Sequence, residues 1–444
     1  MHQIDWTILI FTILFIVIYG SYKTRKNKNI QSFLKGDNSS NWLTIGISVM
    51  ATQASAITFL STPGQAYYDG MGFLQFYLGL PLAMIIICMF FVPLYHKLKV
   101  YTAYEFLERR FDRKTRTLGA ILFLIQRGLA AGITIFAPSI ILSTVLGIDI
   151  KVLNFLIGFL VIIYTVTGGT KAVNITQKQQ MFIIFLGLFF VFFILIEKFP
   201  ENLTINKFLD YSKSSEKFKI LDFSLDLDNR YTFWSGITGG LFLALSYFGT
   251  DQSQVQRYIS GKSIREIRLG LIFNGVFKIP MQFFILLLGV MVFVFFEFSK
   301  SPVNYNPQVI SYLEKNHSSE YDKLIQEYDE LTNNKRKFQD IFLLSGAEFP
   351  SELKSIQKKE KELRKEIKTI VSRNKNTVEE NDKDYVFLNF ILNYLPTGLI
   401  GLLIAVIICA AMSSTASELN ALAATTTIDI YKRSHKNYKS ENHY

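Results

Sequence analysis

Apolar and polar positions alternate in long blocks along the 444-residue chain, and nine of the apolar blocks are long enough to cross a bilayer. A run of about 20 apolar residues is the signature of a transmembrane α-helix. The pattern therefore predicts an all-α integral membrane protein. The predicted spans are residues 5–20, 42–67, 71–95, 118–146, 152–166, 180–197, 232–249, 269–296 and 386–412.

Lysine and arginine cluster in every second loop between these spans. The basic loops follow the first, third, fifth, seventh and ninth spans, and the other short loops carry few charges. Basic loops stay on the cytoplasmic side of a membrane. We therefore expect the N-terminus outside, the C-terminus inside, and the protein in the cytoplasmic (inner) membrane. These basic loops also explain the net charge of +11. We therefore expect the protein to lie in a lipid bilayer and not to bind nucleic acid.

Two longer segments are predicted to lie outside the membrane. Residues 198–230 form an external loop, and residues 299–385 form a charged insert with Glu, Lys and Leu at helical spacing. We expect the insert to be a solvated helical hairpin with a turn at Gly346 and Pro350. A spacer without chemistry is the simpler interpretation, and any protein partner of the hairpin stays unidentified.

The second span is unusually polar for a membrane helix. Gln53, Ser55 and Thr58 lie within it, and Pro63 and Gly64 follow. Polar groups at that depth face a protein interior or a wet cavity. Helix breakers beside them suggest an interrupted helix whose free carbonyl groups bind a cation or a solute. A hydrogen-bonded contact between helices explains the pattern equally well.

Three later spans also carry polar groups. Arg127 and Lys278 could each neutralise an anionic solute or form a structural ion pair. Glycines between positions 236 and 249 mark the seventh span as a second interrupted helix, and two such helices are typical of inverted-repeat transporters. Adjacent Ser413 and Ser414, near the inner end of the ninth span, could bind a sodium ion or merely bond back to the helix.

Two extended motifs carry a family resemblance. Residues 168–180 match the pattern Gly-Gly-x-x-Ala-Val-x-x-Thr-Asp-x-x-Gln, and residues 410–431 match Ala-x-x-Ser-Ser…Asn…Asp-Ile-Tyr. Together with Thr250-Asp251-Gln252, they resemble the sodium:solute symporter family over nearly all spans. The resemblance implies a broken-helix inverted-repeat (five-plus-five) transporter fold with one extra N-terminal helix.

The resemblance also implies a sodium site. Its ligands would be backbone carbonyls of the first core helix and of the serine-bearing helix, plus both hydroxyls. Some members of the family have a second sodium site, but here Gln177 replaces an acidic residue and Ala416 replaces a serine. We therefore expect one sodium ion per cycle. The expected ligands are Ala51, Ala54, Ala410, Ser413 and Ser414.

The solute site implied by the resemblance is less uniform across the family. The first core helix looks more like the sialic-acid and monocarboxylate branches than like the sugar branch, which favours a carboxylate-bearing solute. Arg127 lies one turn before the position of the arginine that sialic-acid members use, which is Ala130 here. The candidate solute residues are Gln53, Ser55, Thr58, Tyr247, Lys278 and Arg127.

The resemblance also implies a division of the chain into segments. On this division, the sequence ends after the eighth of the ten core helices that the family fold contains. The predicted segments are residues 1–41 (extra helix and cytoplasmic loop), 42–197 (first inverted repeat), 198–230 (external loop), 231–298 (core helices 6 and 7), 299–385 (insert), 386–431 (core helix 8) and 432–444 (basic tail).

Sodium-coupled symport of a small polar solute is therefore the leading hypothesis. A sugar or polyol symporter, or a non-transporting membrane sensor or interaction protein of the same fold, are the alternatives. An enzyme is not expected, because the sequence shows no nucleophile–base pair, metal cluster or phosphate-binding loop.

Overall fold

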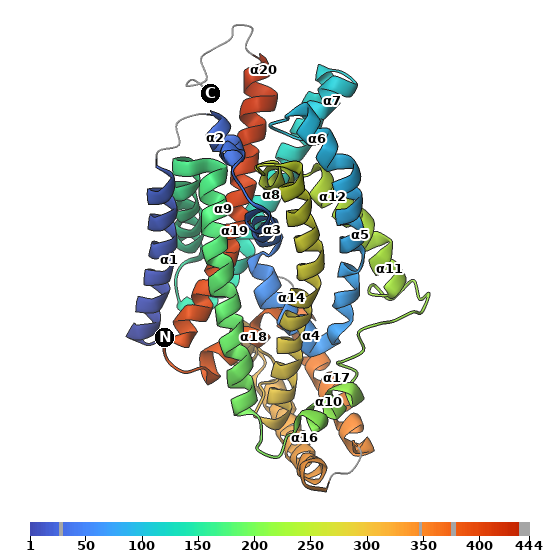
Figure 1. The fold of residues 1–444 in the computed structure, drawn as a ribbon. Helices are drawn as coiled ribbons and strands as arrows, with labels where there is room; N and C mark the ends of the chain where they lie inside the picture. Colours follow the sequence, from blue (N-terminus) through green and yellow to red (C-terminus); the bar gives the residue numbers. More distant parts are fainter. Residues whose placement is uncertain (26–29, 346–348, 374–378, 435–444) are drawn as a thin grey trace.

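The computed structural model describes residues 1–25, 30–345, 349–373 and 379–434, and these residues form helices without any β-strand. Within them, six helices are long and apolar enough to cross a membrane, in addition to one bent pair. The charged insert lies at one end of the molecule, and α1 (Gln3–Thr24) runs along one side of the helical body (Figure 1). The final helix, α20 (Lys432–Ser434), lies at the opposite end (Figure 1).

The second predicted span is interrupted halfway. Its two parts, α3 (Trp42–Gln53) and α4 (Ala56–Asp69), meet at an angle of 65°. Ala54 leaves the helical region (φ −83°, ψ 85°), and Ser55 is extended. The interruption lies ahead of Pro63, which α4 accommodates within the helix, so small and hydroxyl residues mark the break better than the proline does.

The fifth and sixth predicted spans belong to one 49-residue element, α9 (Ile150–Lys198), which folds back on itself at Gly169 (φ 52°, ψ −140°). The reversal is visible at Gly20 of α1, where an added Cβ would lie 3.7 Å from the Cβ of Tyr164 and would also contact Thr176. A straight helix would separate those two residues by about 18 Å. Gly169 adopts a backbone conformation open essentially to glycine alone.

The other spans follow their predicted positions with longer ends. The third is a run of short helical pieces from Met71 to Leu98, and the seventh is divided at Thr238, which keeps nearly helical torsion angles (φ −89°, ψ −71°). That second interruption is therefore milder than the first. The remaining elements are α7 (Glu105–Arg110), α8 (Arg113–Leu146), α10 (Ile205–Ser214), α11 (Phe233–Ile237), α12 (Gly239–Thr250), α13 (Gln252–Tyr258) and α14 (Ile264–Phe298).

The prediction of a ninth span over residues 386–412 was wrong. The chain forms α18 (Lys383–Tyr394), breaks at Leu395 and Pro396, and begins the long helix α19 (Leu399–Thr425) after Gly398 (φ 94°). A π-helical turn, Thr426–Tyr431, continues α19 into α20. Because α19 starts 13 residues later than expected, Ser413 and Ser414 lie in its middle rather than near its end.

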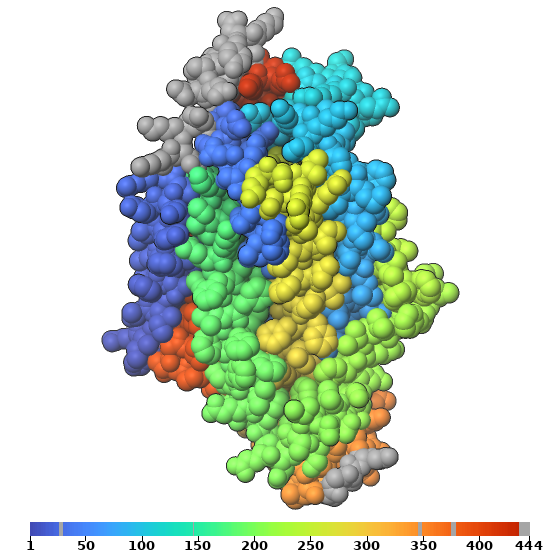
Figure 2. Space-filling view, in the orientation of Figure 1, coloured from blue at the N-terminus to red at the C-terminus, as the bar shows by residue number. Residues whose placement is uncertain are grey.

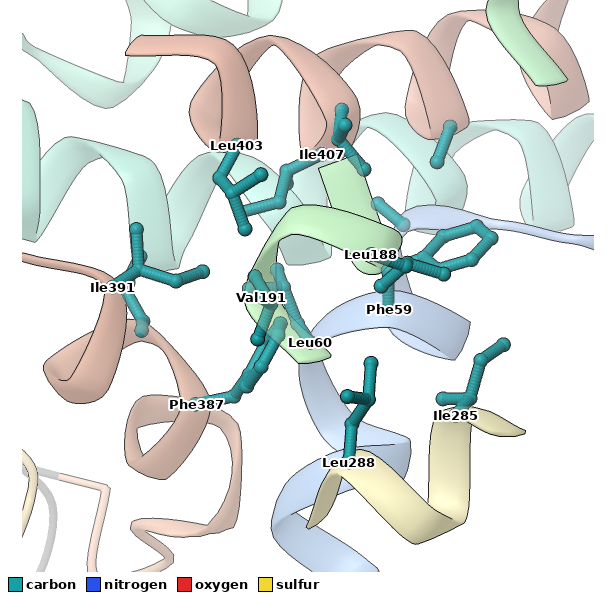
Figure 3. Close-up of a cluster of buried hydrophobic side chains, with 14 of the residues drawn as sticks. Phe59, Leu60, Leu188, Val191, Ile285, Leu288, Phe387, Ile391, Leu403 and Ile407 are labelled. Carbon is teal, nitrogen blue, oxygen red and sulfur yellow. The ribbon is translucent and has the colours of Figure 1, made fainter. Parts of the chain in front are cut away.

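The apolar core surrounds α4. Figure 3 shows Phe59 and Leu60 of α4 between side chains of α9, α14, α18 and α19, such as Leu188, Leu288 and Phe387. Along one face of the molecule, α1, α9 and α14 lie in sequence from blue to yellow (Figure 2). The broken helix is thus enclosed by apolar side chains at its second half.

The insert forms the expected helical hairpin, but the hairpin packs against the transmembrane helices instead of being solvated on all sides. It contains α15 (Pro307–Asn316), α16 (Ser318–Ser345) and α17 (Ser351–Arg373); Pro350 lies between the last two, whereas Gly346 and residues 435–444 of the tail lie outside the described residues. Apolar residues at helical spacing on α16 and α17 face each other, including Leu324, Tyr328, Leu363 and Ile367.

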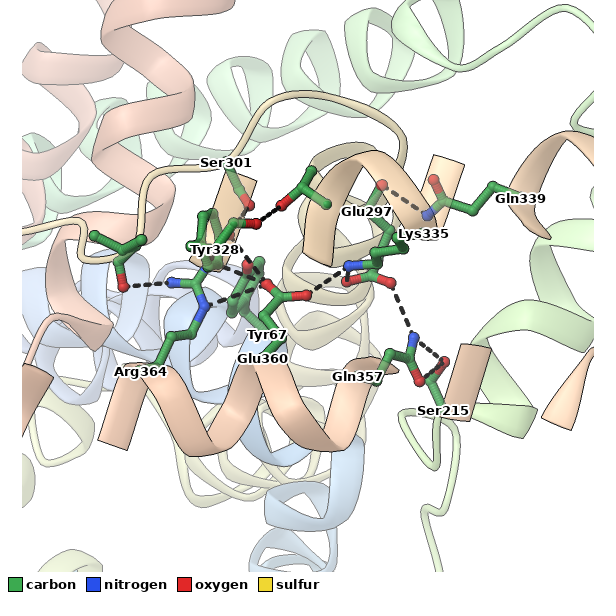
Figure 4. A network of polar contacts seen from close by, with 12 residues as sticks. Tyr67, Ser215, Glu297, Ser301, Tyr328, Lys335, Gln339, Gln357, Glu360 and Arg364 are labelled. Atoms are coloured by element: carbon green, nitrogen blue, oxygen red, sulfur yellow. Dashed lines mark hydrogen bonds and ion pairs between the residues drawn. The ribbon is translucent and has the colours of Figure 1, made fainter. Parts of the chain in front are cut away.

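A buried ionic network joins the insert to the end of α14. Lys335 of α16 lies 2.7 Å from both Glu297 of α14 and Glu360 of α17, and Arg364 lies 3.2 Å from Glu360 (Figure 4). Burial raises the pKa of Glu360, but Lys335 and Arg364 outweigh it and lower that pKa below its ordinary value. The insert is therefore docked on the helices, since buried charges are tolerated only when they are paired.

We predict that Glu360→Gln destabilises the protein by about 3–5 kcal/mol, because it leaves Lys335 and Arg364 buried with one carboxylate fewer. Thermal unfolding of the purified protein measures the loss. The matched control is Glu362→Gln, two residues along the same helix and exposed to solvent. Equal unfolding midpoints for the two variants would contradict a docked insert.

Candidate functional site

The break between α3 and α4 releases two backbone carbonyl groups. In a continuous helix the N–H of Ser55 would bond to Ala51 O, but it bonds to Gln53 O at 3.1 Å. The N–H of Thr58 likewise bonds to Ser55 O at 3.0 Å instead of Ala54 O. The carbonyls of Ala51 and Ala54 are thus free to accept other partners in a buried place.

Ser413 of α19 bonds to one of these carbonyls, and a second buried serine follows it in the sequence. Ser413 Oγ donates to Ala51 O at 2.9 Å and lies 3.2 Å from Ala410 O. Ser414 is 3% exposed, and its Oγ has no hydrogen-bond partner among the described residues. Buried hydroxyls normally find a partner, so an unpartnered one on the residue directly after Ser413 is consistent with a cation site. The structure thus joins Ala51, Ala410 and Ser413 directly.

The buried amide of Gln177 fills the space one turn further along α19. Its Nε2 lies 2.9 Å from Ser417 Oγ, 3.1 Å from Thr52 Oγ1 and 3.1 Å from Ser413 O, while its Oε1 accepts from Ser48 Oγ. Three oxygens therefore surround an N–H donor. A cation at that point would need those same oxygens.

Three of the predicted solute-binding residues line a cavity of about 520 Å³: Gln53, Arg127 and Tyr247. Lys278 lies next to it, with its Nζ 5.9 Å from the ring centroid of Tyr77, a lining residue. Ser55 and Thr58 do not line this cavity. They are half-buried at the start of α4.

Lys278 is fully buried on α14, and its ammonium group has no hydrogen-bond partner among the described residues. A buried charge without a counter-charge is strongly unfavourable in a protein interior. This residue therefore differs from Arg127, which sequence reasoning had treated in the same way.

Arg127 is paired with two carboxylates. Its Nη1 lies 3.1 Å from Glu418 Oε1 on α19, and its Nη2 contacts Asp251 between α12 and α13. The guanidinium also lies 5.5 Å from the ring centroid of Tyr247. Of the two interpretations drawn from the sequence for Arg127, the structure shows the structural ion pair. The sequence contained a sign that Glu418 is functional or ion-paired, because it is the only charged residue within the long helix α19.

Comparison with known proteins identifies the class. The sequence model of the sodium:solute symporter family matches residues 33–330 and 367–444, so the chain belongs to that family. This is a family of membrane transporters and not of enzymes, and sodium is the ion to which its members couple transport.

Curated relatives include several sodium-coupled carriers. The chain is 32% identical to sodium-coupled monocarboxylate transporter 1 of Xenopus laevis over 274 residues, which is 61% of this chain and 44% of the relative. It is 31% identical to the human sodium/iodide cotransporter over 271 residues, covering 61% and 41% of the two chains. The chain thus matches less than half the length of these relatives.

A solved structure has the same fold. A sodium-coupled sialic acid symporter, in a substrate-bound outward-open state, superimposes with a TM-score of 0.73 at 25% identity. The match covers 100% of this chain and 76% of the other. The resemblance inferred from the sequence motifs, and an all-α multi-pass membrane protein, are therefore confirmed.

We predict that Arg127→Gln destabilises the protein more than the double change Arg127→Gln with Glu418→Gln. The single change leaves two buried carboxylates without their counter-charge, a loss of about 3–5 kcal/mol, and the second change removes one of those carboxylates. Unfolding midpoints of both variants in detergent micelles provide the comparison. If the double variant is the less stable one, the carboxylates do not depend on Arg127.

Proposed function

We propose that the protein is a symporter that moves one sodium ion together with a small polar solute across the cytoplasmic membrane. A solute that carries a carboxylate group is favoured. The observation that carries the proposal is the meeting of Ser413 Oγ with the freed carbonyl of Ala51 and with Ala410 O. With Ala54 O and the unpartnered Ser414 Oγ, these groups offer five oxygens, close to the number that sodium prefers.

The position of this site supports coupling between ion and solute. The sodium ligand Ala54 is adjacent to Gln53, which lines the 520 Å³ cavity. An ion that orders the break between α3 and α4 would therefore also order one wall of the solute cavity. Such shared ordering gives positive coupling between two ligands.

Gln177 supports a stoichiometry of one. Its amide Nε2 takes up Thr52 Oγ1, Ser413 O and Ser417 Oγ, so these oxygens have a neutral donor instead of a second ion. Ala416 supplies no hydroxyl nearby.

Lys278 supports an anionic solute. A carboxylate bound beside the Tyr77 wall would supply the counter-charge that its buried ammonium lacks among the described residues. Tyr247 and Gln53 offer hydrogen bonds to the polar remainder of the solute, and Arg127 acts through its ion pairs rather than as the anion receptor. The monocarboxylate, iodide and sialic acid carriers among the similar proteins agree with this charge.

The transport cycle follows from the fold of the family. We infer a five-plus-five inverted repeat, of which α3–α4 begins the first half and α11–α12 the second, with alternating access around the break. From the basic loops we infer that α20 and the C-terminus lie inside and the insert outside. We keep that orientation for the directions named below.

Replacing both serines is the direct test of the ion site. Ser413→Ala with Ser414→Ala should abolish sodium activation of uptake and leave membrane insertion intact, because two ligands vanish while alanine suits a helix. Thr425→Ala, on the same helix and about 16 Å away, is the control. Unchanged sodium activation in proteoliposomes containing the double variant would refute the site.

Stoichiometry is tested by the gradient at which net flux stops. One charge crossing about 100 mV yields about 2.3 kcal/mol, and a tenfold sodium gradient adds about 1.4 kcal/mol, enough to concentrate a neutral solute about 500-fold. A monovalent anion cancels the transported charge and leaves about tenfold. We expect a ratio near one, rising when Gln177→Asp is combined with Ala416→Ser. A ratio near two in the unmodified protein would contradict this interpretation.

A further inference from the structure

A second cavity, of about 820 Å³, lies at the insert end of the molecule. It is walled by the end of α4, the start of the third span, the loop after α10, the end of α14, and one face of α17. It is distinct from the 520 Å³ cavity, with which it shares no lining residue. Eight lining residues are basic and five are acidic: Lys217, Lys219, Lys358, Lys361, Arg364, Lys365, Lys368 and Lys383 against Asp69, Glu216, Asp222, Glu297 and Glu360.

Four of the five acidic groups already have cationic partners. Asp69 pairs with Lys383 at 2.6 Å, and Asp222 lies 3.3 Å from Lys219. Glu297 and Glu360 share Lys335, as described above. Only Glu216, an exposed residue, lacks an ion pair among the described residues.

Only half of the eight basic groups have such partners among the described residues: Lys219, Arg364, Lys368 and Lys383 are paired with carboxylates. Lys358, Lys361 and Lys365 project from the exposed side of α17 and make no ion pair with a described residue. Their spacing of three and four residues places them in one row on the helix. The wall of the cavity therefore presents an unneutralised positive row.

Lys217 adds a less solvated ammonium group to that row. Its Nζ donates to Tyr68 O at 2.6 Å and lies 4.6 Å from the ring centroid of Phe293, with no carboxylate at ion-pair distance among the described residues. Burial lowers its pKa to about 8, although Glu297 and Asp69 act in the opposite direction, with Lys361 assisting burial and Glu360 opposing it. An anion in the cavity would supply the missing counter-charge.

We propose that this cavity is a sodium-independent binding site for small organic anions, formed by α17 together with Lys217. It accepts a carboxylate on the insert side of the protein before any sodium-coupled step. A positive cavity concentrates anions locally and speeds their encounter with the protein. Binding here depends on the charges of the cavity and not on the sodium ligands of α19, so it stands or falls separately from the proposed symport.

The insert is the reason for the site. The family model matches residues up to 330 and again from 367, so the stretch carrying Lys358, Lys361 and Lys365 lies outside the matched segments. The buried network of Glu297, Lys335 and Glu360 holds α17 against the bundle and so holds this row over the cavity.

Saturation-transfer NMR on the full chain in nanodiscs tests the proposal with pyruvate as probe, in choline buffer without sodium. Pyruvate should give a transfer signal, and pyruvamide, its neutral counterpart, should give much less. Lys358→Glu with Lys361→Glu and Lys365→Glu should weaken pyruvate binding about tenfold, because three attractions become repulsions. The control reverses the same number of exposed charges on other helices of the insert, at Lys315, Lys323 and Lys337.

Titration supplies an independent readout for Lys217. The pyruvate signal should fall as the pH rises through about 8, the value to which burial lowers the Lys217 pKa, because deprotonation removes the ammonium charge. Lys217→Met should abolish this step. Equal signals for pyruvate and pyruvamide, or equal loss in the control triple variant, would overturn the proposal, whereas loss of sodium-driven uptake alone would leave it standing.

Discussion

A backbone carbonyl that loses its helical partner inside a bilayer must find another, and this constraint organises the structure around residues 51–58. The break between α3 and α4 frees Ala51 O and Ala54 O where lipid offers no hydrogen bonds. The hydroxyl of Ser413 on α19 donates a hydrogen bond of 2.9 Å to Ala51 O. A second contact anchors α19 from the other side, because Tyr164 of α9 donates to Met412 O at 3.1 Å. These two contacts hold α19 where it supplies a hydroxyl group to the broken helix.

Apolarity along the sequence predicted most spans but not how every apolar block is used. It could not distinguish α18, which packs along α4, from the following helix α19, because both are apolar and adjacent. Pro396, and the positive φ of Gly398, separate them. Similarly, the two halves of α9 were foreseen as separate spans, but not their reversal at the single residue Gly169, which brings both halves against α1 near Gly20.

The candidate site was predictable to the extent that short motifs carry it. Ala51, Ala410 and Ser413 were expected to meet. The hydroxyl of Ser413 lies within hydrogen-bond distance of the backbone oxygens of both Ala51 and Ala410. The ion pair of Arg127 with Glu418 was not foreseen, because 291 residues separate the partners and no local spacing relates them. Pairing across such a distance depends on how α8 and α19 pack, which is information carried by the fold as a whole.

The docking of the insert also has a mechanical consequence. Tyr67 of α4 shares a hydrogen bond of 2.8 Å with Tyr305 and packs edge-on against Phe293 of α14. Glu297 of α14 is bound in turn to Lys335 of α16. Aromatic contacts therefore hold the insert end of α4 against α14, and separating α14 from α16 would leave buried charges unpaired. The half of the broken helix that lies beyond the break, α4, is therefore tied through α14 to the insert, so the ion pairs of α16 and α17 also restrain the position of α4.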